Sequence, residues 1–229
     1  MIPLRDSTPR HGVPFVNHAV IAACTVVFGW ELMAGPEIDA IVEQYGLVPS
    51  RFLALADRHS LVSAELWLPF VTSAFLHGGL GHFVFNMVFL WVFGDNVEDR
   101  FGHVRYALFY LSGAVFAGAA HLAANPMSVV PTIGASGAIA AVMGAYFVLY
   151  PRAWITSIVL PFFWIRFSVP ALIYLAIWFA LQIYRGTAAL DGDASAAGIA
   201  WWAHAGGFAF GALAILALGR QRHPQRQQG

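Results

Sequence analysis

The stretch 132-TIGASGAIAAVMGAYFVL-149 consists almost entirely of apolar and small residues, with an isolated serine near its start. Runs of this kind are typical of helices that cross a lipid bilayer. Ser136 stands between Gly134 and Gly137, so almost no side-chain bulk surrounds its hydroxyl. A serine in this setting is either a small residue that lets two helices pack closely or a nucleophile, and the stretch alone is compatible with both.

The composition of the whole chain places this stretch in a membrane protein. Of 229 residues, 59% are hydrophobic and 10% are charged, and the mean hydropathy is +0.67. Soluble domains carry about 25% charged residues, so this chain cannot shield its apolar surface from water by folding alone. The formal net charge is zero, which argues against nucleic acid as a partner. The single cysteine, Cys24, excludes an internal disulfide.

Apolar segments of about 20 residues predict the membrane spans. Six candidates occur, and together they predict an all-α, polytopic, six-span membrane protein with a single domain over residues 1–229. The predicted spans are residues 15–34, 68–93, 105–123, 135–150, 170–184 and 199–218. Segment 151–170 is also apolar, but prolines and two arginines interrupt it, so we expect a loop at the membrane interface there rather than a seventh span.

The distribution of charge predicts which side of the membrane each loop occupies. Six spans place both termini, loop 94–104 and loop 151–169 on one side, and that side carries nine of the twelve arginines. The nine are Arg5, Arg10, Arg100, Arg105, Arg152, Arg166, Arg220, Arg222 and Arg226. Because positive residues stay cytoplasmic, we expect cytoplasmic termini, in a membrane that we expect to be the bacterial cytoplasmic membrane. Loop 35–67 is then external and long enough to hold short helices.

Polar residues within the predicted spans mark candidate functional positions, because they are costly at membrane depth. They are His77, His82 and Asn86 in the second span, His121 in the third, Ser136 in the fourth and His204 in the sixth. His82 and Asn86 are four residues apart and share one helix face, whereas His77 would lie about 140° around the helix from His82. Each residue alone could equally be a packed polar group bonded to a neighbouring backbone.

The direction of the spans brings several of these residues to one depth. Spans two, four and six all run inward from the external side, and their polar residues lie in the outer portions. Span six contains 201-WWAHAGGFAFGALA-214, in which Gly207 and Gly211 form a GxxxG pattern that allows close helix packing. A short serine side chain reaches a histidine on another helix only where the backbones nearly touch. The pattern therefore favours contact between Ser136 and His204.

A serine and a histidine in contact can act as the nucleophile and the base of a hydrolase. We expect Ser136 to attack the substrate and His204 to take its proton. The oxyanion that forms needs preorganised donors, and the backbone N–H of Ser136, the amide of Asn86 and a ring N–H of His82 are candidates. No acid is placed to complete a triad, so the sequence predicts a Ser–His dyad.

Other kinds of site receive less support from the sequence. There is no HExxH motif, and His77 and His82 are expected on different helix faces without a nearby carboxylate, so we expect no metal. No P-loop or dinucleotide fingerprint occurs, so we expect no cofactor. A six-span transporter or channel would explain buried histidines but not their pairing with GASG and AHAGG. The inverted repeats common in transporters are also not visible in the sequence.

The polar motifs resemble those of the rhomboid family of intramembrane serine proteases. They are 77-HGGLGHFVFN-86, 134-GASG-137 and 203-AHAGG-207, each in the expected one of six spans. The resemblance extends over about residues 12–219 and implies a compact, rhomboid-like bundle of six helices with an active site that opens outward. It also implies that the substrates are transmembrane proteins, cut in or near the lipid bilayer. Segment 185–198 would match a loop that caps the site.

The resemblance also implies roles for single residues. Ser136 matches the nucleophile, His204 the base, and His82 and Asn86 the oxyanion residues. The supporting positions are Gly134, which matches the glycine in the turn before the serine, His77, which matches a structural histidine, and Gly137, Gly207 and Gly211, which are expected to permit close packing.

One position departs from the family pattern. Well-studied members carry an aromatic residue four positions after the serine, where it stacks on the catalytic histidine, and this chain has Ala140. The ring of His204 therefore needs another support. A non-catalytic relative that binds membrane helices is the alternative within the family, but such a protein should lack the serine or the histidine, and both are present.

Overall fold

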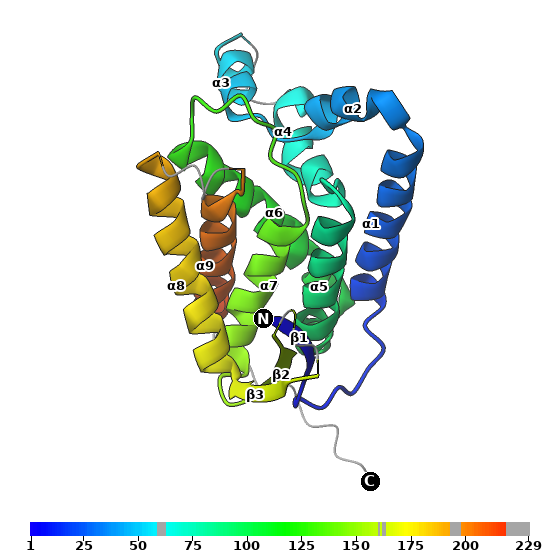
Figure 1. Cartoon of the computed structure of the whole chain (residues 1–229), viewed down its shortest axis with the longest axis vertical. Coiled ribbons are helices and arrows are strands. Elements are labelled where there is room, and N and C mark those ends of the chain that lie inside the picture. The colour runs from blue at the N-terminus through cyan, green and yellow to red at the C-terminus, as the bar shows by residue number, and fades with distance from the viewer. Residues whose placement is uncertain (59–62, 160, 162–163, 193–197, 219–229) are drawn as a thin grey trace.

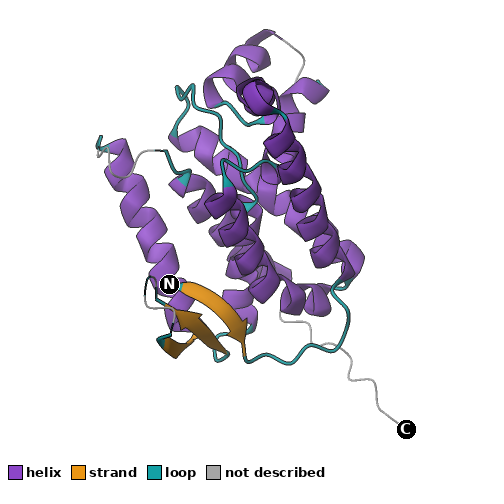
Figure 2. Ribbon diagram, turned by 45° about the vertical axis from the view of Figure 1, so that its right-hand side comes forward, coloured by secondary structure: helices purple, strands orange, loops and turns teal. Residues whose placement is uncertain are grey.

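The structure is a computed structural model, and it describes residues 1–58, 63–159, 161, 164–192 and 198–218. Within these residues the chain forms a bundle of helices with a small sheet at one end (Figures 1 and 2). The tail 219–229 and residues 193–197 of the segment expected to cap the site lie outside the described residues. Residues 185–190 of that segment belong to a helix.

Five helices of the described residues are long and apolar enough to cross a bilayer. They are α1 (Phe15–Met33), α5 (Leu80–Phe101), α6 (His103–Ala124), α8 (Ala171–Leu190) and α9 (Trp201–Leu218). Large apolar side chains stay exposed along them, for example Val26, Leu108 and Leu213. Such surfaces suit lipid rather than water. The prediction of an all-α polytopic membrane protein is confirmed.

Helix α7 (Ser136–Leu149) is the short central helix of the bundle. Its 14 residues extend over roughly 21 Å, which is less than the thickness of a bilayer core. Figure 1 shows α7 between α5 and α9, and most of its residues are buried. Because protein rather than lipid surrounds it, α7 has no need to extend across the membrane. Its first residue, Ser136, therefore starts inside the bundle.

The predicted second span, residues 68–93, is wrong in its bounds. The structure has α4 (Ala64–Thr72) and the 3-10 turn η2 (Ser73–Phe75), and the long helix α5 begins only at Leu80. The chain is extended at Leu76, and Gly79 has a φ of 142°, which a residue with a side chain rarely adopts. His77 therefore lies in a loop before the helix, and its predicted position 140° around the helix from His82 does not apply.

Helix α5 also runs further than expected at its other end. The predicted loop 94–104 is helical except for the turn at Gly102, which has a φ of 75°. One buried acid of this segment, Glu98, is satisfied by the segment that begins α1. The carboxylate of Glu98, 1% exposed, accepts hydrogen bonds from the backbone N–H of Val16 at 2.9 Å and of Asn17 at 2.7 Å. These bonds fix the start of α1 against the end of α5.

The first loop, residues 35–67, holds short helices, as the sequence predicts. They are η1 (Gly35–Glu37), α2 (Ile38–Tyr45), α3 (Pro49–Arg58) and the beginning of α4. Figure 1 shows them at the end of the bundle opposite the sheet. The loop is tied to the segment before α7, because Leu47 and Thr132 exchange backbone hydrogen bonds of 3.0 and 2.8 Å.

A three-stranded antiparallel sheet was not predicted. Strand β1 (Ile2–Asp6) pairs with β2 (Trp154–Ile158), which pairs with β3 (Arg166–Pro170), in the order β1-β2-β3. The expected loop 151–170 therefore contains two strands. Along β2, Ile155 and Ser157 are fully buried while Trp154 is exposed, which is the alternation of a half-buried strand. The sheet depends on pairing with the distant N-terminal segment, so the local sequence of 151–170 did not reveal it.

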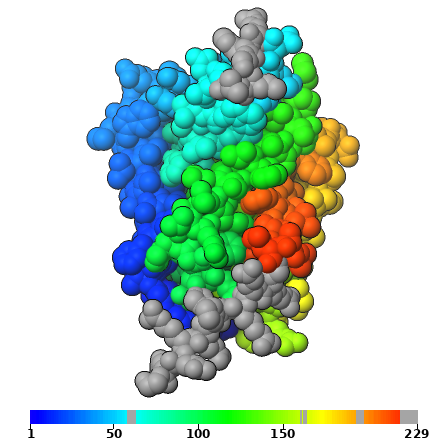
Figure 3. Space-filling view, turned by 180° about the vertical axis from the view of Figure 1, so that it is seen from behind, coloured from blue at the N-terminus to red at the C-terminus, as the bar shows by residue number. Residues whose placement is uncertain are grey.

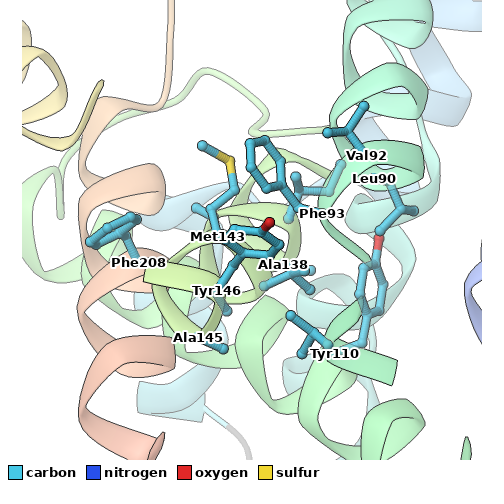
Figure 4. Packing of buried hydrophobic residues seen from close by; sticks show 14 of the residues in the cluster. Leu90, Val92, Phe93, Tyr110, Ala138, Met143, Ala145, Tyr146 and Phe208 are labelled. Atoms are coloured by element: carbon cyan, nitrogen blue, oxygen red, sulfur yellow. The ribbon is translucent and has the colours of Figure 1, made fainter. Parts of the chain in front are cut away.

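The buried side chains gather around α7. Figure 4 shows Phe93 of α5 close to Met143 and Tyr146 of α7, with Phe208 of α9 on the other side of α7. The rings of Phe93 and Tyr146 meet edge to face with centroids 5.1 Å apart. On the far side of the molecule, α6 and α9 lie side by side and cover α7 (Figure 3). Lipid is as apolar as these side chains, so close packing rather than exclusion of water holds the helices together.

Candidate active site

Ser136 and His204 are in hydrogen-bonding contact. The distance from Ser136 Oγ to His204 Nε2 is 2.8 Å, and the two residues come from the first turn of α7 and the first turn of α9. Both side chains are partly buried and face a shared cavity. The contact is therefore short enough for a proton to pass from the hydroxyl to the ring nitrogen.

Glycines allow the two helices to approach closely enough for this contact. A Cβ atom at Gly207 would collide with the carbonyl oxygen of Gly137, and one at Gly211 would collide with that of Ala141. A Cβ at Gly137 would in turn collide with the side chain of Ala117 on α6. The GxxxG pattern thus serves the crossing of α7 and α9, as the sequence suggested.

A tight turn at Gly134 leads into α7 and brings the side chain of His82 close. Gly134 has a φ of 119°, and its N–H donates to the carbonyl oxygen of Ser73 at 2.8 Å. A Cβ atom there would collide with the ring of His82. The N–H of Gly78 donates to Nδ1 of His82 at 3.3 Å. Because Nδ1 accepts this bond, the proton of a neutral His82 ring is on Nε2, which points towards the turn.

Asn86 presents a donor without a partner. Its side chain is 6% exposed, and its Nδ2 atom makes no hydrogen bond among the described residues. It lies one helical turn beyond His82 on α5, and Nδ2 would be 3.6 Å from a Cβ atom at Gly134. A buried amide without a partner costs about 1–3 kcal/mol. Asn86 lines the same cavity as Ser136 and His204, so its N–H is available to an oxygen atom bound there.

His77 does not face the cavity. It is 3% exposed, its Nδ1 atom lies 3.1 Å from the carbonyl oxygen of Phe75, and its backbone N–H donates to the Glu31 carboxylate at 3.0 Å. Its ring packs edge-on against His82, with centroids 5.4 Å apart. His77 thus fastens the loop before α5 to α1 and lies behind His82, which is a structural position.

A cavity of about 820 Å³ opens in front of the Ser–His pair. Its walls come from α5, α6, α7, α8 and α9. The polar groups in it include His82, Asn86, His121, Asn125, Ser136, Gln182 and His204. Apolar side chains such as Phe89 and Met143 line the deeper part. The cavity is large enough for several residues of a polypeptide and for the water that hydrolysis consumes.

The sequence analysis missed Gln182. This residue of α8 is 5% exposed, and its Oε1 atom lies 2.9 Å from Nδ1 of His204. Its Nε2 atom donates to the carbonyl oxygen of Trp178 at 3.0 Å. A lone amide in an otherwise apolar span was a signal that could have singled it out. The acceptor beside His204 is an amide rather than the acid that occupies this place in a Ser–His–Asp triad.

The structure also shows what flanks His204 in place of an aromatic residue at position 140. Ala140 is fully buried, and a Cβ atom at Gly207 would lie 3.3 Å from that of Ala140, so the helix crossing leaves no room for a ring. Trp178 lies beside His204 instead, with ring centroids 5.9 Å apart and planes tilted by 34°. Trp201 meets the ring edge-on at 6.2 Å.

Metal ligation receives no support from the part of the chain that the structure describes. Within it, no three His, Cys, Asp or Glu side chains are grouped so that they could hold a metal ion. The cavity instead unites a hydroxyl, a ring nitrogen and free N–H donors, at the centre of a bundle of apolar helices. The fold and the site define a polytopic membrane protein with a hydrolase-like serine–histidine pair inside the bundle.

Comparison with known proteins identifies the family. A model of the rhomboid domain matches residues 64–221, which is more than half of the chain. The chain therefore belongs to the rhomboid family, and it is an integral, multi-pass membrane protein related to rhomboid proteases. The match begins with α4 and includes α5, α7 and α9, which carry the candidate site.

Individual relatives come from bacteria and from eukaryotic organelles. The chain is 36% identical over 90 residues to the rhomboid protease GluP of Bacillus subtilis, which covers 39% of this chain and 17% of that protein. It is 33% identical over 160 residues to the mitochondrial RHOMBOID-like protein 12 of Arabidopsis thaliana. This match covers 63% of this chain and 44% of that protein. It is 28% identical over 149 residues to the mitochondrial Rhomboid protein 1 of Saccharomyces cerevisiae. This match covers 63% of this chain and 39% of that protein. The matched part spans less than half the length of each of these three relatives.

Proposed function

We propose that this protein is an intramembrane serine protease that cleaves transmembrane proteins with a dyad of Ser136 and His204. The observation that carries the proposal is the 2.8 Å contact between Ser136 Oγ and His204 Nε2 within a cavity at the start of a buried helix. Membership of the rhomboid family, with a relative named as a rhomboid protease, agrees with it. We further propose that residues 1–229 act as a single domain.

The proposed reaction begins at the hydroxyl. His204 Nε2 takes the proton of Ser136 as Oγ attacks the carbonyl carbon of the scissile peptide bond. The carbonyl oxygen becomes an oxyanion, and the expected donors to it are Nδ2–H of Asn86, Nε2–H of His82 and the backbone N–H of Ser136. The N–H groups of the first helical turn lack partners within the helix, so that of Ser136 is free to donate.

The reaction is completed by return of the proton. The imidazolium of His204 protonates the leaving nitrogen, which releases the first product with a new amino terminus. A water molecule from the cavity then attacks the acyl-serine while His204 takes one of its protons. Collapse of the second oxyanion breaks the ester bond, and Ser136 Oγ recovers its proton from His204. Atoms and charge balance with water as the only co-reactant.

We propose a membrane orientation with the sheet on the cytoplasmic side. Strand β1, the turn between α5 and α6, and strands β2 and β3 all lie at one end of the bundle (Figure 1). These are the segments that the distribution of arginines assigns to the cytoplasm. The cavity then opens towards the external side, and a transmembrane substrate reaches it from the surrounding lipid. We propose the bacterial cytoplasmic membrane as its location.

Cleavage of a single-pass membrane protein by the purified enzyme tests the proposal. The substrate, with a fluorescent group on each side of its span, is incubated with enzyme in detergent and in liposomes, and the cut is located by mass spectrometry. We expect cleavage by the wild type and none by Ser136→Ala or His204→Ala. A fluorophosphonate probe should label the wild type and neither variant. Cleavage by Ser136→Ala at the wild-type rate would exclude the serine mechanism.

A further inference from the structure

Gln182 is a buried polar residue of the cavity wall that the dyad mechanism does not use. It belongs to α8, a largely apolar helix at the edge of the bundle (Figure 1), yet it is 5% exposed and lines the cavity. A buried amide in a membrane helix is costly unless its bonds are made. Both ends of this amide are bonded, one to Trp178 and the other to His204.

The bond to Trp178 fixes the direction of the amide. The carbonyl oxygen of Trp178 can only accept a hydrogen bond, so the NH₂ group of Gln182 must face it, at 3.0 Å. The oxygen of the amide then faces Nδ1 of His204, at 2.9 Å. Turning the amide over would place two oxygens against each other at the first contact. The arrangement therefore has a single orientation of Gln182 that satisfies both neighbours.

The direction of the amide in turn fixes the proton on His204. Since Gln182 presents an oxygen, Nδ1 of His204 must carry the hydrogen. In the neutral ring Nε2 is then unprotonated, and it is Nε2 that lies 2.8 Å from Ser136 Oγ. This is the tautomer that can accept the serine proton. The opposite tautomer would offer an N–H to the hydroxyl and could not act as a base.

We propose that Gln182 is a positioning residue that holds His204 in the catalytic tautomer and orientation. The proposal rests on the proposed function of the Ser136–His204 dyad and deepens it. Gln182 takes the place that an acid occupies in soluble serine hydrolases, but without a charge. An uncharged acceptor suits a site among apolar helices, where an unpaired carboxylate would be costly. Trp178 contributes twice, since its carbonyl directs the amide and its ring flanks His204.

The surroundings of His204 leave this role to Gln182. The titratable groups that face it are His82 on α5, His121 on α6 and Ser136 on α7, and among the described residues the cavity wall contains no carboxylate. The rings of Trp178 and Trp201 limit sideways movement, but neither supplies an acceptor to Nδ1. Among the described residues, the acceptor at Nδ1 is the amide oxygen of Gln182.

Variants at position 182 test the proposal through the kinetics of purified enzyme. Gln182→Met keeps the length and removes the acceptor, and we expect kcat to fall roughly tenfold or more while KM changes little. Gln182→Glu keeps an oxygen at the same reach and should recover most of kcat. Its carboxylate stabilises the imidazolium, which cannot take a proton, so the acid limb of the pH–rate profile should move to higher pH. Leu181→Met, on the exposed side of α8, is the matched control and should keep the wild-type kcat.

A spectroscopic measurement tests the tautomer without a change at position 182. In wild-type protein with ¹⁵N-labelled histidine, the signals of His204 are assigned by their loss in His204→Ala. We expect a protonated Nδ1 and an unprotonated Nε2 at neutral pH. An Nε2-protonated ring in the wild type would overturn the proposal even if the variants at 182 did not fold.

The kinetic outcomes separate this proposal from that of the dyad. A Gln182→Met enzyme with wild-type kcat and pH profile would refute the positioning role while leaving the dyad intact. Equal losses in folded Gln182→Met and Gln182→Glu, with no movement of the acid limb, would show that the side chain acts by packing alone. Undiminished cleavage by Ser136→Ala would instead refute the dyad, whatever the results at position 182.

Discussion

Two buried polar side chains at the site are not required by packing. The Nδ2 group of Asn86 is buried without a partner, and the amide of Gln182 lies in an apolar helix. In a protein shaped by stability alone, apolar side chains of similar size would serve better at both positions. Each polar group points towards the Ser136–His204 pair or its cavity. The presence of these two polar groups is therefore understandable if they act on a substrate or on the base.

Replacement of Asn86 by alanine should separate activity from stability. Asn86→Ala removes one of three expected oxyanion donors, so we expect kcat to fall roughly 10- to 100-fold, which is less than the loss in Ser136→Ala. Because the amide has no partner to lose, the thermal unfolding midpoint should not fall. The two quantities are measured on one detergent preparation. A marked loss of stability with unchanged kcat would contradict the expected role.

Replacement of Gly134 by alanine should disturb the site through the backbone. The φ of 119° is strained for a residue with a side chain, and the added methyl group would push the ring of His82 aside. We expect Gly134→Ala to lose roughly 1–3 kcal/mol of unfolding free energy and to lower kcat. Gly81→Ala on α5 is the matched control, because open space surrounds that position. Equal behaviour of the two variants would contradict this account.

At the scale of elements, the crossing of α7 and α9 positions the dyad. The backbones meet where Gly207 and Gly211 face carbonyl oxygens of α7, so a single methyl group would force the helices apart. The first turns of both helices carry the reactive side chains, and a shift of about 1 Å there is enough to lower activity 100-fold. Close packing at this crossing is thus a condition for the chemistry as well as for the fold.

Replacement of Gly207 by alanine should therefore affect stability and activity together. The new methyl group would collide with the carbonyl oxygen of Gly137, and we expect Gly207→Ala to lose roughly 1–3 kcal/mol and most of its kcat. Gly29→Ala on α1 adds a methyl group in open space and should be neutral or stabilising by up to about 1 kcal/mol. Thermal unfolding in detergent and reporter cleavage measure both effects. A Gly207→Ala protein as active as Gly29→Ala would contradict the argument.

The sequence predicted some elements well because their signals are local. Continuous apolar runs located α1, α6 and α9 to within about two residues at most ends. The second predicted span failed because α4 and α5 are both apolar, and hydropathy does not register the break that Gly79 introduces between them. The sheet was missed because β1 pairs with a segment about 150 residues away.

The residues of the candidate site also divide into those with a local sequence signal and those that depend on packing between distant segments. Ser136, His204, His82 and Asn86 could be singled out because polar groups in apolar spans are conspicuous, and the structure places all four around one cavity. Their catalytic roles stay predictions. The contact between Gln182 and His204 depends on how α8 lies against α9, and no local pattern specifies that arrangement. The position of Trp178 beside His204 follows from the same packing.

At the scale of the whole molecule, the proposed orientation predicts which surface faces the outside. Cys24 is the single cysteine of the sequence, so a Cys24→Ala background contains no native thiol. A cysteine introduced as Asp39→Cys in the first loop should react with a membrane-impermeant maleimide on intact cells. One introduced as Arg152→Cys beside the sheet should react only after the cells are opened. The reverse pattern would show that the protein is inserted the other way round.

The sheet has a mechanical consequence for α8. Strand β3 ends at Pro170 and α8 begins at the next residue, where the N–H of Ala171 donates to the carbonyl oxygen of Ala153 at 2.7 Å. This bond ties the first residue of α8 to the residue that precedes β2. Gln182 lies roughly 17 Å along it and Leu190 roughly 29 Å, so a tilt moves Gln182 a little more than half as far as the tip. If α8 tilts away from the bundle about this end, the amide of Gln182 moves away from His204, so their hydrogen bond weakens as the entrance to the cavity widens.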